Sequence, residues 1–83
     1  MNIYAGNLSY DTRDSDLEQA FAAFGKVDSA RVIMDSDTNR SKGFGFVDMP
    51  QRAARRAIEG LHGSTYAGRD LTVRFAQPRQ FGG

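Results

Sequence analysis

The segment of residues 42–49, with the sequence KGFGFVDM, restricts the fold more than any other part of the chain. Successive side chains of a strand point to opposite faces of a sheet. As a strand, this segment places a cation and two aromatic rings on one face: Lys42, Phe44 and Phe46. The other face carries small or aliphatic side chains: Gly43, Gly45, Val47 and Met49. Neighbouring rings on one strand face must be either covered or used, and a flat aromatic row beside a cation suits stacked nucleobases.

Hydrophobic periodicity divides the rest of the chain into three more strands and two helices. Alternating apolar and polar residues predict strands over residues 2–8, 27–34 and 70–76. Two other segments repeat apolar residues at i, i+3, i+4 and i+7, the spacing of an amphipathic helix. These residues are Leu17, Ala20, Phe21 and Phe24 within residues 14–24, and Ala54, Ala57, Ile58 and Leu61 in a helix that begins at Pro50. Residues 35–41 are a polar loop in which Asn39 can adopt the left-handed conformation.

The order strand, helix, strand, strand, helix, strand predicts a two-layer α+β sandwich. Each helix has a single apolar stripe, so both helices are expected on one face of a four-stranded sheet. The opposite face then meets solvent or a ligand. Strand parity predicts its residues: Tyr4, Arg31, Ile33, Lys42, Phe44, Phe46, Thr72 and Arg74.

Length and composition limit the protein to a few classes. A chain of 83 residues is expected to form one domain, and the absence of cysteine excludes disulfides and thiolate metal sites. No apolar run is long enough to cross a bilayer, and the N-terminus does not read as a signal peptide, so a soluble, cytoplasmic protein is expected. The net charge of +1 is uneven, because residues 1–30 carry −3 and residues 31–83 carry +4.

Two motifs resemble those of the RNA recognition motif (RRM) family. Residues 42–49 are similar to its RNP1 motif, [KR]-G-[FY]-[GA]-F-V-x-[FY], at seven of eight positions, and residues 3–8 are similar to its RNP2 motif. Met49 replaces the last aromatic residue, but strand parity places it in the core. The resemblance spans residues 1–78 and implies a ferredoxin-like βαββαβ sandwich with an antiparallel sheet. Residues 79–83 are expected to be a flexible tail, as in the small single-RRM bacterial glycine-rich RNA-binding proteins that the chain resembles.

The resemblance also implies a role for each residue of the open face. Tyr4 and Phe46 would stack successive bases, Phe44 would pack against the sugars, and Lys42 would bind a phosphate or a base edge. The full set of expected RNA-binding residues is Tyr4, Asn7, Arg31, Ile33, Arg40, Lys42, Phe44, Phe46, Arg74, Ala76 and Gln77. Of these, the last three would offer charged or main-chain hydrogen bonds. The expected partner is single-stranded RNA, and single-stranded DNA is the alternative. The protein is expected to be a monomer that needs no cofactor or metal and does not bind a membrane.

Other interpretations compete at several of these positions. The open face could dock a protein instead of RNA, although no helix-forming segment follows residue 76 to cover it. Arg40 could grip a phosphate or be a solvated charge. The three arginines of the second predicted helix are expected to form a solvated face: Arg52, Arg55 and Arg56. The alternative is a secondary contact for longer RNA or an acidic partner. Gly43 and Gly45 are expected to let a helix approach the sheet.

Enzymatic activity is not expected from this sequence. Gly43-Phe44-Gly45 could be mistaken for a phosphate-binding loop, but it lies inside a strand and lacks the third glycine. The single histidine, His62, is expected to be a turn residue, and the carboxylates are scattered over loops and helix starts.

Overall fold

The structure of the protein is a computed structural model, which describes residues 1–76. Gln77, the predicted domain boundary at residue 78 and the predicted tail lie outside the described residues. The elements in chain order are β1 (Asn2–Gly6), α1 (Asp14–Ala22), β2 (Ser29–Met34), β3 (Ser41–Asp48), α2 (Gln51–Leu61), β4 (Thr65–Tyr66), β5 (Arg69–Asp70) and β6 (Thr72–Phe75).

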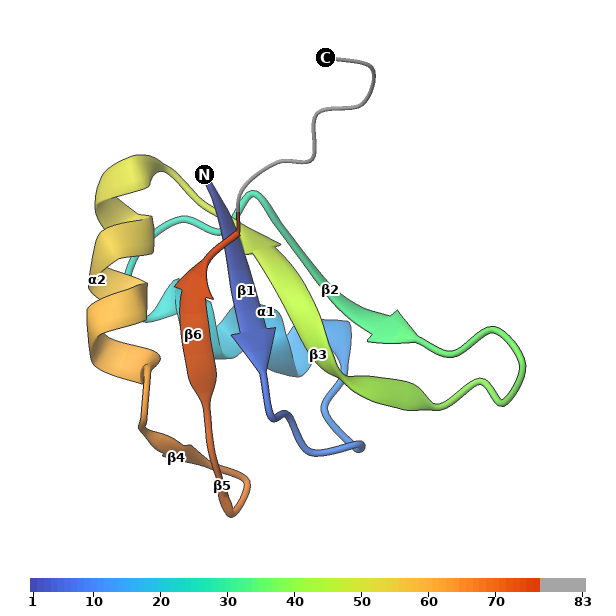
Figure 1. Ribbon diagram of the computed structural model, residues 1–83. Coiled ribbons are helices and arrows are strands. Elements are labelled where there is room, and N and C mark those ends of the chain that lie inside the picture. Colours follow the sequence, from blue (N-terminus) through green and yellow to red (C-terminus); the bar gives the residue numbers. More distant parts are fainter. Residues whose placement is uncertain (77–83) are drawn as a thin grey trace.

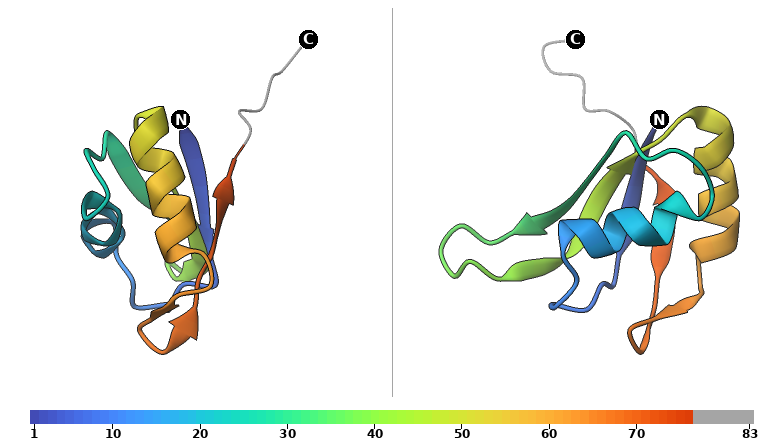
Figure 2. Two further views of the ribbon diagram at one scale, coloured as in Figure 1. Left: turned by 90° about the vertical axis from the view of Figure 1, so that its left-hand side faces the viewer. Right: turned by 180° about the vertical axis from the view of Figure 1, so that it is seen from behind.

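The main sheet has four strands in the order β2-β3-β1-β6, and every neighbouring pair is antiparallel. Both helices pack on the same side of this sheet, so the molecule has two layers (Figures 1 and 2). The side opposite the helices is called the outer face below. The predicted α+β sandwich is therefore confirmed, with the RNP2-like motif on β1 and the RNP1-like motif on β3, the two adjacent central strands.

The core lies between the sheet and the two helices. Its fully buried members include Ile3 of β1, Phe21 of α1, Val47 of β3 and Ala57 of α2. Met49, the residue that departs from the RNP1 pattern, is also completely buried. The parity prediction for the inner face of β3 is therefore correct at Gly45, Val47 and Met49.

Gly43 and Gly45 of β3 require glycine for different physical reasons. A Cβ on Gly45 would lie 3.0 Å from the Leu17 Cδ2 atom of α1 and 2.5 Å from the Arg31 carbonyl oxygen, so this residue does allow the helix to approach. A Cβ on Gly43 would meet only the Tyr10 ring and the Leu8 carbonyl oxygen, both outside the helices. Gly43 instead has a φ of +82°, which favours glycine, so the helix-approach prediction is wrong at this position.

The predicted last strand, residues 70–76, is divided in the structure. Thr65 and Tyr66 pair with Asp70 and Arg69 in a separate two-stranded sheet, β4-β5, before the chain enters β6. Ala67 and Gly68 close this hairpin with positive φ values of 51° and 79°. The hairpin was not predicted, because the alternation of residues 70–76 looks continuous and two-residue strands leave almost no periodic signal.

Smaller differences occur at the ends of other elements. α1 ends at Ala22 rather than at residue 24, and β2 begins at Ser29 rather than at residue 27. A register shift between Val32 and Met34 leaves Met34 52% exposed, although alternation groups it with the buried Val32. Asn39 has a φ of 57°, as predicted for its loop.

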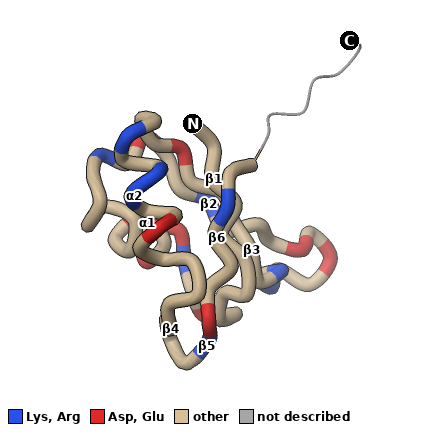
Figure 3. Tube along the Cα trace, turned by 60° about the vertical axis from the view of Figure 1, so that its left-hand side comes forward, with Lys and Arg blue, Asp and Glu red and all other residues tan. Residues whose placement is uncertain are grey.

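The basic residues of α2 lie away from the outer face. Arg52, Arg55 and Arg56 are all exposed, and Figure 3 shows the blue segments along this helix on the helix side of the sheet. None of the helices within residues 1–76 has the length and apolar character needed to cross a membrane.

Candidate nucleic-acid interface

The outer face carries one aligned row of side chains across all four strands. Arg31 of β2 pairs with Phe46 of β3, Phe46 pairs with Tyr4 of β1, and Tyr4 pairs with Arg74 of β6. Directly paired residues of neighbouring strands present their side chains on the same face. The row therefore has an aromatic centre with a guanidinium at each end.

Phe44 joins the two central rings to form a compact cluster. The ring centroids of Tyr4, Phe44 and Phe46 are 5.8 to 6.0 Å apart in every pair. Tyr4 and Phe44 are inclined by only 28°, whereas Phe46 meets the other two edge to face. All three rings are half-buried, and no helix or strand among residues 1–76 lies over them (Figure 2). These three residues are called the aromatic platform below.

The Tyr4 ring lies along its own strand, above Gly6. A Cβ built on Gly6 would be only 2.6 to 2.8 Å from the Oη, Cε1 and Cζ atoms of Tyr4, so the absence of a side chain at Gly6 makes room for the ring. The Arg74 guanidinium carbon is 4.8 Å from the ring centroid, which is within the range of a cation–π contact. The position of Tyr4 is thus set by a glycine beneath it and a cation beside it.

The remaining predicted residues of the outer face take different positions. Lys42 is exposed at the start of β3, and Ile33 is half-buried near the irregular end of β2. Ala76 follows β6, and its main-chain N–H donates to the Asn2 carbonyl oxygen at 2.9 Å. That N–H completes the sheet, and a main-chain hydrogen bond from Ala76 to RNA stays a prediction.

Asn7 lies just beyond β1 and joins that strand to the β4-β5 hairpin. It has a φ of 59°, and its Nδ2 donates to the Asp70 carbonyl oxygen at 2.7 Å. Its Oδ1 accepts from Arg69 Nε and Nη2 at 3.3 and 3.2 Å. The Asn7 side chain therefore holds the β4-β5 hairpin to the end of β1, a structural role that the sequence around Asn7 did not indicate.

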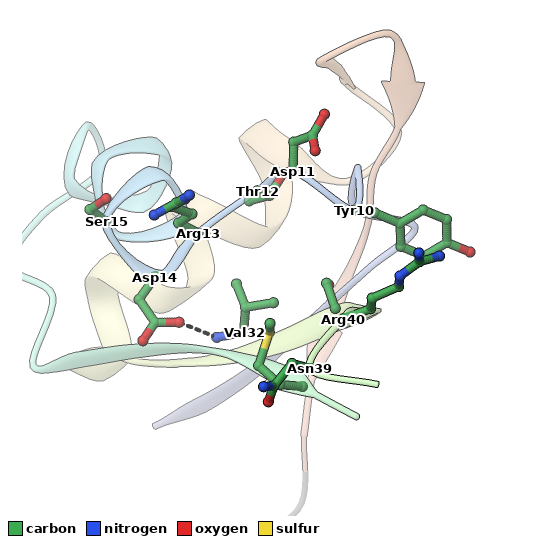
Figure 4. Close-up of a pocket in the computed structure, with 11 residues that line it drawn as sticks. Tyr10, Asp11, Thr12, Arg13, Asp14, Ser15, Val32, Asn39 and Arg40 are labelled. Atoms are coloured by element: carbon green, nitrogen blue, oxygen red, sulfur yellow. Dashed lines mark hydrogen bonds between the residues drawn. The ribbon is translucent and has the colours of Figure 1, made fainter. Parts of the chain in front are cut away.

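Arg40 is separated from the platform, because it lies in the β2–β3 loop beside an open hollow of about 1490 Å³. The hollow lies between this loop and the start of α1, where Asp14 accepts a hydrogen bond from the Val32 N–H at 2.7 Å (Figure 4). Arg40 and Tyr10 occupy the same end of it in Figure 4, away from Asp14. The lining of this hollow contains both acidic and basic side chains. Within residues 1–76, no group of His, Asp or Glu side chains could hold a metal ion.

Tyr10 and Arg69 belong to the same surface, although the sequence did not indicate them. Both line a smaller hollow of about 220 Å³ next to the platform, together with Tyr4, Lys42 and Phe44. The Tyr10 ring is 67% exposed and has the Arg69 guanidinium carbon 5.9 Å from its centroid. Tyr10 could have been identified as a candidate because it is an aromatic residue in a polar loop, outside the apolar repeats that mark the core.

Comparisons with known proteins agree with this geometry. Residues 3–72 match the family description of the RNA recognition motif. RbpA of Synechocystis sp., which is named as an RNA-binding protein, is 46% identical over 81 residues, covering 96% of this chain and 80% of the relative. A glycine-rich RNA-binding protein of Daucus carota is 44% identical over 80 residues, covering 95% of this chain and 51% of that protein.

Solved structures give the same result. The crystal structure of an RNA-binding protein called PG1 superimposes with a TM-score of 0.92 at 51% identity, covering 96% of this chain and 98% of that one. The Sxl-lethal protein in its complex with RNA superimposes with a TM-score of 0.88 at 32% identity, covering 96% of this chain and 48% of that one. The chain belongs to the RNA recognition motif family.

Proposed function

We propose that this protein is a single-stranded RNA-binding module that acts in post-transcriptional regulation of RNA. It stacks about two to four nucleotides on the outer face of its sheet. The observation that carries the proposal is the uncovered aromatic platform, whose three ring centroids lie 5.8 to 6.0 Å apart. Two of its rings, Tyr4 and Phe46, lie in one cross-strand row with an arginine at each end. The family membership and the RNA complex of a structural neighbour support the same function.

Each residue of the platform has a separate proposed role. Tyr4 and Phe46 stack two successive bases, because they are direct cross-strand partners, and Phe44 packs against the sugars. Arg31 and Arg74 lie at the two ends of the same row, where they can bind phosphates or base edges. The other proposed RNA contacts are Asn7, Ile33, Arg40, Lys42, Ala76 and Gln77, the last of which lies outside the described residues.

The free energies of base stacking and of association limit the expected affinity for RNA. Stacking contributes about 1 to 3 kcal/mol per base, and the association cost is estimated at about 4 to 15 kcal/mol. Only a modest net free energy of binding then remains for two or three stacked bases and a few phosphate contacts, so we expect a Kd in roughly the micromolar range. Few cations face the ligand, so the dependence of affinity on salt should be shallow.

The test is a calorimetric titration with short oligonucleotides of random sequence, comparing single-stranded RNA, single-stranded DNA and duplex RNA. Phe46→Ala should weaken binding of single-stranded RNA by about 1 to 3 kcal/mol. Phe75→Ala is the matched control, because Phe75 is a 44% exposed phenylalanine whose strand partner is the buried Ile3, on the helix side of the sheet. Duplex RNA should bind poorly, because its bases are already stacked.

Three outcomes would contradict parts of the proposal. Binding that resists Phe46→Ala would show that the platform is not the site. Equal affinity for DNA of the same sequence would place the protein among general single-strand binders, and no response to any oligonucleotide would favour a protein ligand on the same face. The proposal also includes a cytoplasmic monomer without catalytic activity, whose RNA-binding domain extends to residue 78.

A further inference from the structure

The three arginines of α2 form a group of cations that the proposed function does not use. Arg52, Arg55 and Arg56 are all exposed, and they follow one another at i, i+3 and i+4, so they lie together on the helix surface. The buried residues of the same helix are Ala54 and Ala57. The arginines therefore lie outside the core and present their charges to solvent.

No acidic side chain neutralises these charges in the described part of the chain. The ion pairs found there join the N-terminal ammonium to Asp48 and Lys26 to Asp28, and neither includes an arginine of α2. Glu59 is the only acidic residue of α2, and it forms an ion pair with none of the three arginines. Three arginines and one glutamate leave the helix with a net charge of +2.

This arrangement lowers the stability of the helix instead of supporting it. Like charges three and four positions apart repel each other on a helix surface, and the positive end of the helix dipole repels a cation in the first turn. Arg52 lies in the first turn of α2, which has no acidic residue, whereas the first turn of α1 carries Asp14 and Asp16. A negatively charged ligand therefore explains the arginines of α2 better than folding does.

The position of α2 connects these arginines to the platform. β6 is an edge strand and carries Arg74 at one end of the cross-strand row, and α2 packs against this strand (Figures 1 and 2). A strand of RNA that leaves the platform past Arg74 therefore comes next to α2. At the opposite edge the RNA would meet α1, which packs against β2 and β3 and whose charged residues are all acidic: Asp14, Asp16 and Glu18.

The distance around this edge is short for a nucleic acid. Stacked nucleotides rise by about 3.4 Å each, so about six nucleotides cover the smallest dimension of the molecule, which is 19 Å. An RNA of two to four nucleotides on the platform does not reach α2. A longer single strand can occupy the platform and the arginines of α2 at the same time.

The composition of the α2 surface favours RNA over an acidic protein as the ligand. The large apolar side chains that are exposed in the described residues all lie outside α2: Met1, Tyr10, Met34 and Phe75. Protein interfaces usually have an apolar centre, whereas a phosphate backbone is bound by charges without one. A guanidinium also matches the geometry of phosphate oxygens.

We infer that Arg52, Arg55 and Arg56 bind phosphates of single-stranded RNA that continues from the platform around the β6 edge of the sheet. The contact involves the RNA backbone only, so it adds affinity without reading bases. The inference rests on the proposed function, because the same RNA strand occupies the platform. Short RNA is then held mainly by stacking, and longer RNA is held by stacking and by charge.

The test measures how salt changes the affinity for two single-stranded RNAs by fluorescence anisotropy, with RNA in excess. One RNA has about four nucleotides, which the platform holds, and the other has about 16, which also reach α2. Each phosphate contact adds about 0.7 to the slope of log affinity against log salt, so three contacts add about 2. Between about 50 and 200 mM salt, the wild-type affinity for the longer RNA should fall roughly 20-fold further than the affinity for the shorter RNA.

Three variants separate the charge of α2 from its structure. Replacing all three arginines by glutamine should give the same slope for both RNAs, and the fold should persist because glutamine and arginine have similar helix propensities. Replacing them by lysine keeps the charges and should keep the steeper slope for the longer RNA. Lys26→Gln is the matched control, because it removes an 80% exposed cation outside α2 and should change neither slope.

Two results would overturn the inference, and a third would overturn the proposed function. A wild-type slope that is the same for both RNAs would show that the strand does not reach α2, and would leave an acidic protein as the ligand that these charges fit. A steeper slope that survives the glutamine substitutions would place the additional contacts elsewhere. If neither RNA bound, or if the shorter RNA bound without sensitivity to Phe46→Ala, the proposed function itself would be wrong.

Discussion

Replacing Gly6 by alanine should displace the Tyr4 ring without disrupting the fold. The new Cβ would lie 2.6 Å from Tyr4 Oη and 2.7 Å from Cε1, whereas ordinary van der Waals contact begins at 3.4 Å. The ring must therefore lift by about 0.6 to 0.8 Å, because it is free to move toward solvent while the strand beneath it is not. Gly6 does not have a positive φ, so alanine fits its backbone conformation.

The expected magnitudes separate stability from binding. Alanine in a strand gains about 0.5 to 1 kcal/mol over glycine, which offsets most of the 0.5 to 1.5 kcal/mol cost of an off-rotamer ring. The free energy of unfolding should therefore change by less than about 1 kcal/mol. Complete loss of one stacked base costs about 1 to 3 kcal/mol, so a displaced ring should cost about 1 kcal/mol, or roughly fivefold in Kd.

A double-mutant cycle makes this prediction decisive. Calorimetry with a short single-stranded RNA would compare the wild type, Gly6→Ala, Tyr4→Ala and the double variant, with urea unfolding as the stability control. Gly6→Ala should weaken binding in the wild type and have no further effect once the Tyr4 ring is absent. The same loss in both backgrounds would refute the reasoning, because the alanine would then act through the strand and not through the ring.

Two further substitutions test the packing beneath the platform. Gly45→Ala should lower the free energy of unfolding by about 1 to 3 kcal/mol, since its Cβ would be 2.5 Å from the Arg31 carbonyl oxygen and 3.0 Å from Leu17 Cδ2; unchanged urea unfolding would show that the helix layer is not close-packed here. His62→Ala should cost about 0.5 to 1.5 kcal/mol, because His62 Nδ1 accepts the Val73 N–H at 3.0 Å. The RNA affinity of this variant should equal that of the wild type, and a weaker affinity would contradict a purely structural role.

The sequence predicted the fold and the platform because both follow from periodicity. Alternation along single strands was enough to assign Tyr4, Phe44 and Phe46 to one face, and the structure places them on the outer face of adjacent strands. Parity also predicted Arg31 and Arg74 on the same face as the rings. Their direct pairing with Phe46 and Tyr4 became known only with the register of the four strands.

The parts that the sequence missed depend on loops and on side-chain contacts between distant segments. The hydrogen bonds of Asn7 to Arg69 and Asp70 could not be predicted, because they join residues more than 60 positions apart. Two-residue strands such as β4 and β5 have no measurable period, so their hairpin was not predicted and only its last residue, Asp70, was assigned to a strand. Tyr10 was overlooked for the same reason, because a loop residue belongs to no pattern.

The most direct test of the account is an NMR measurement of contacts between bound single-stranded RNA and the aromatic rings. Intermolecular NOEs should connect base protons to the ring protons of Tyr4 and Phe46, and sugar protons to the ring of Phe44. With an RNA of about four nucleotides, the exposed arginines of α2 should show none. NOEs confined to α2, or a bound RNA without contacts to Tyr4 and Phe46, would contradict the claim that this protein binds RNA on its aromatic platform.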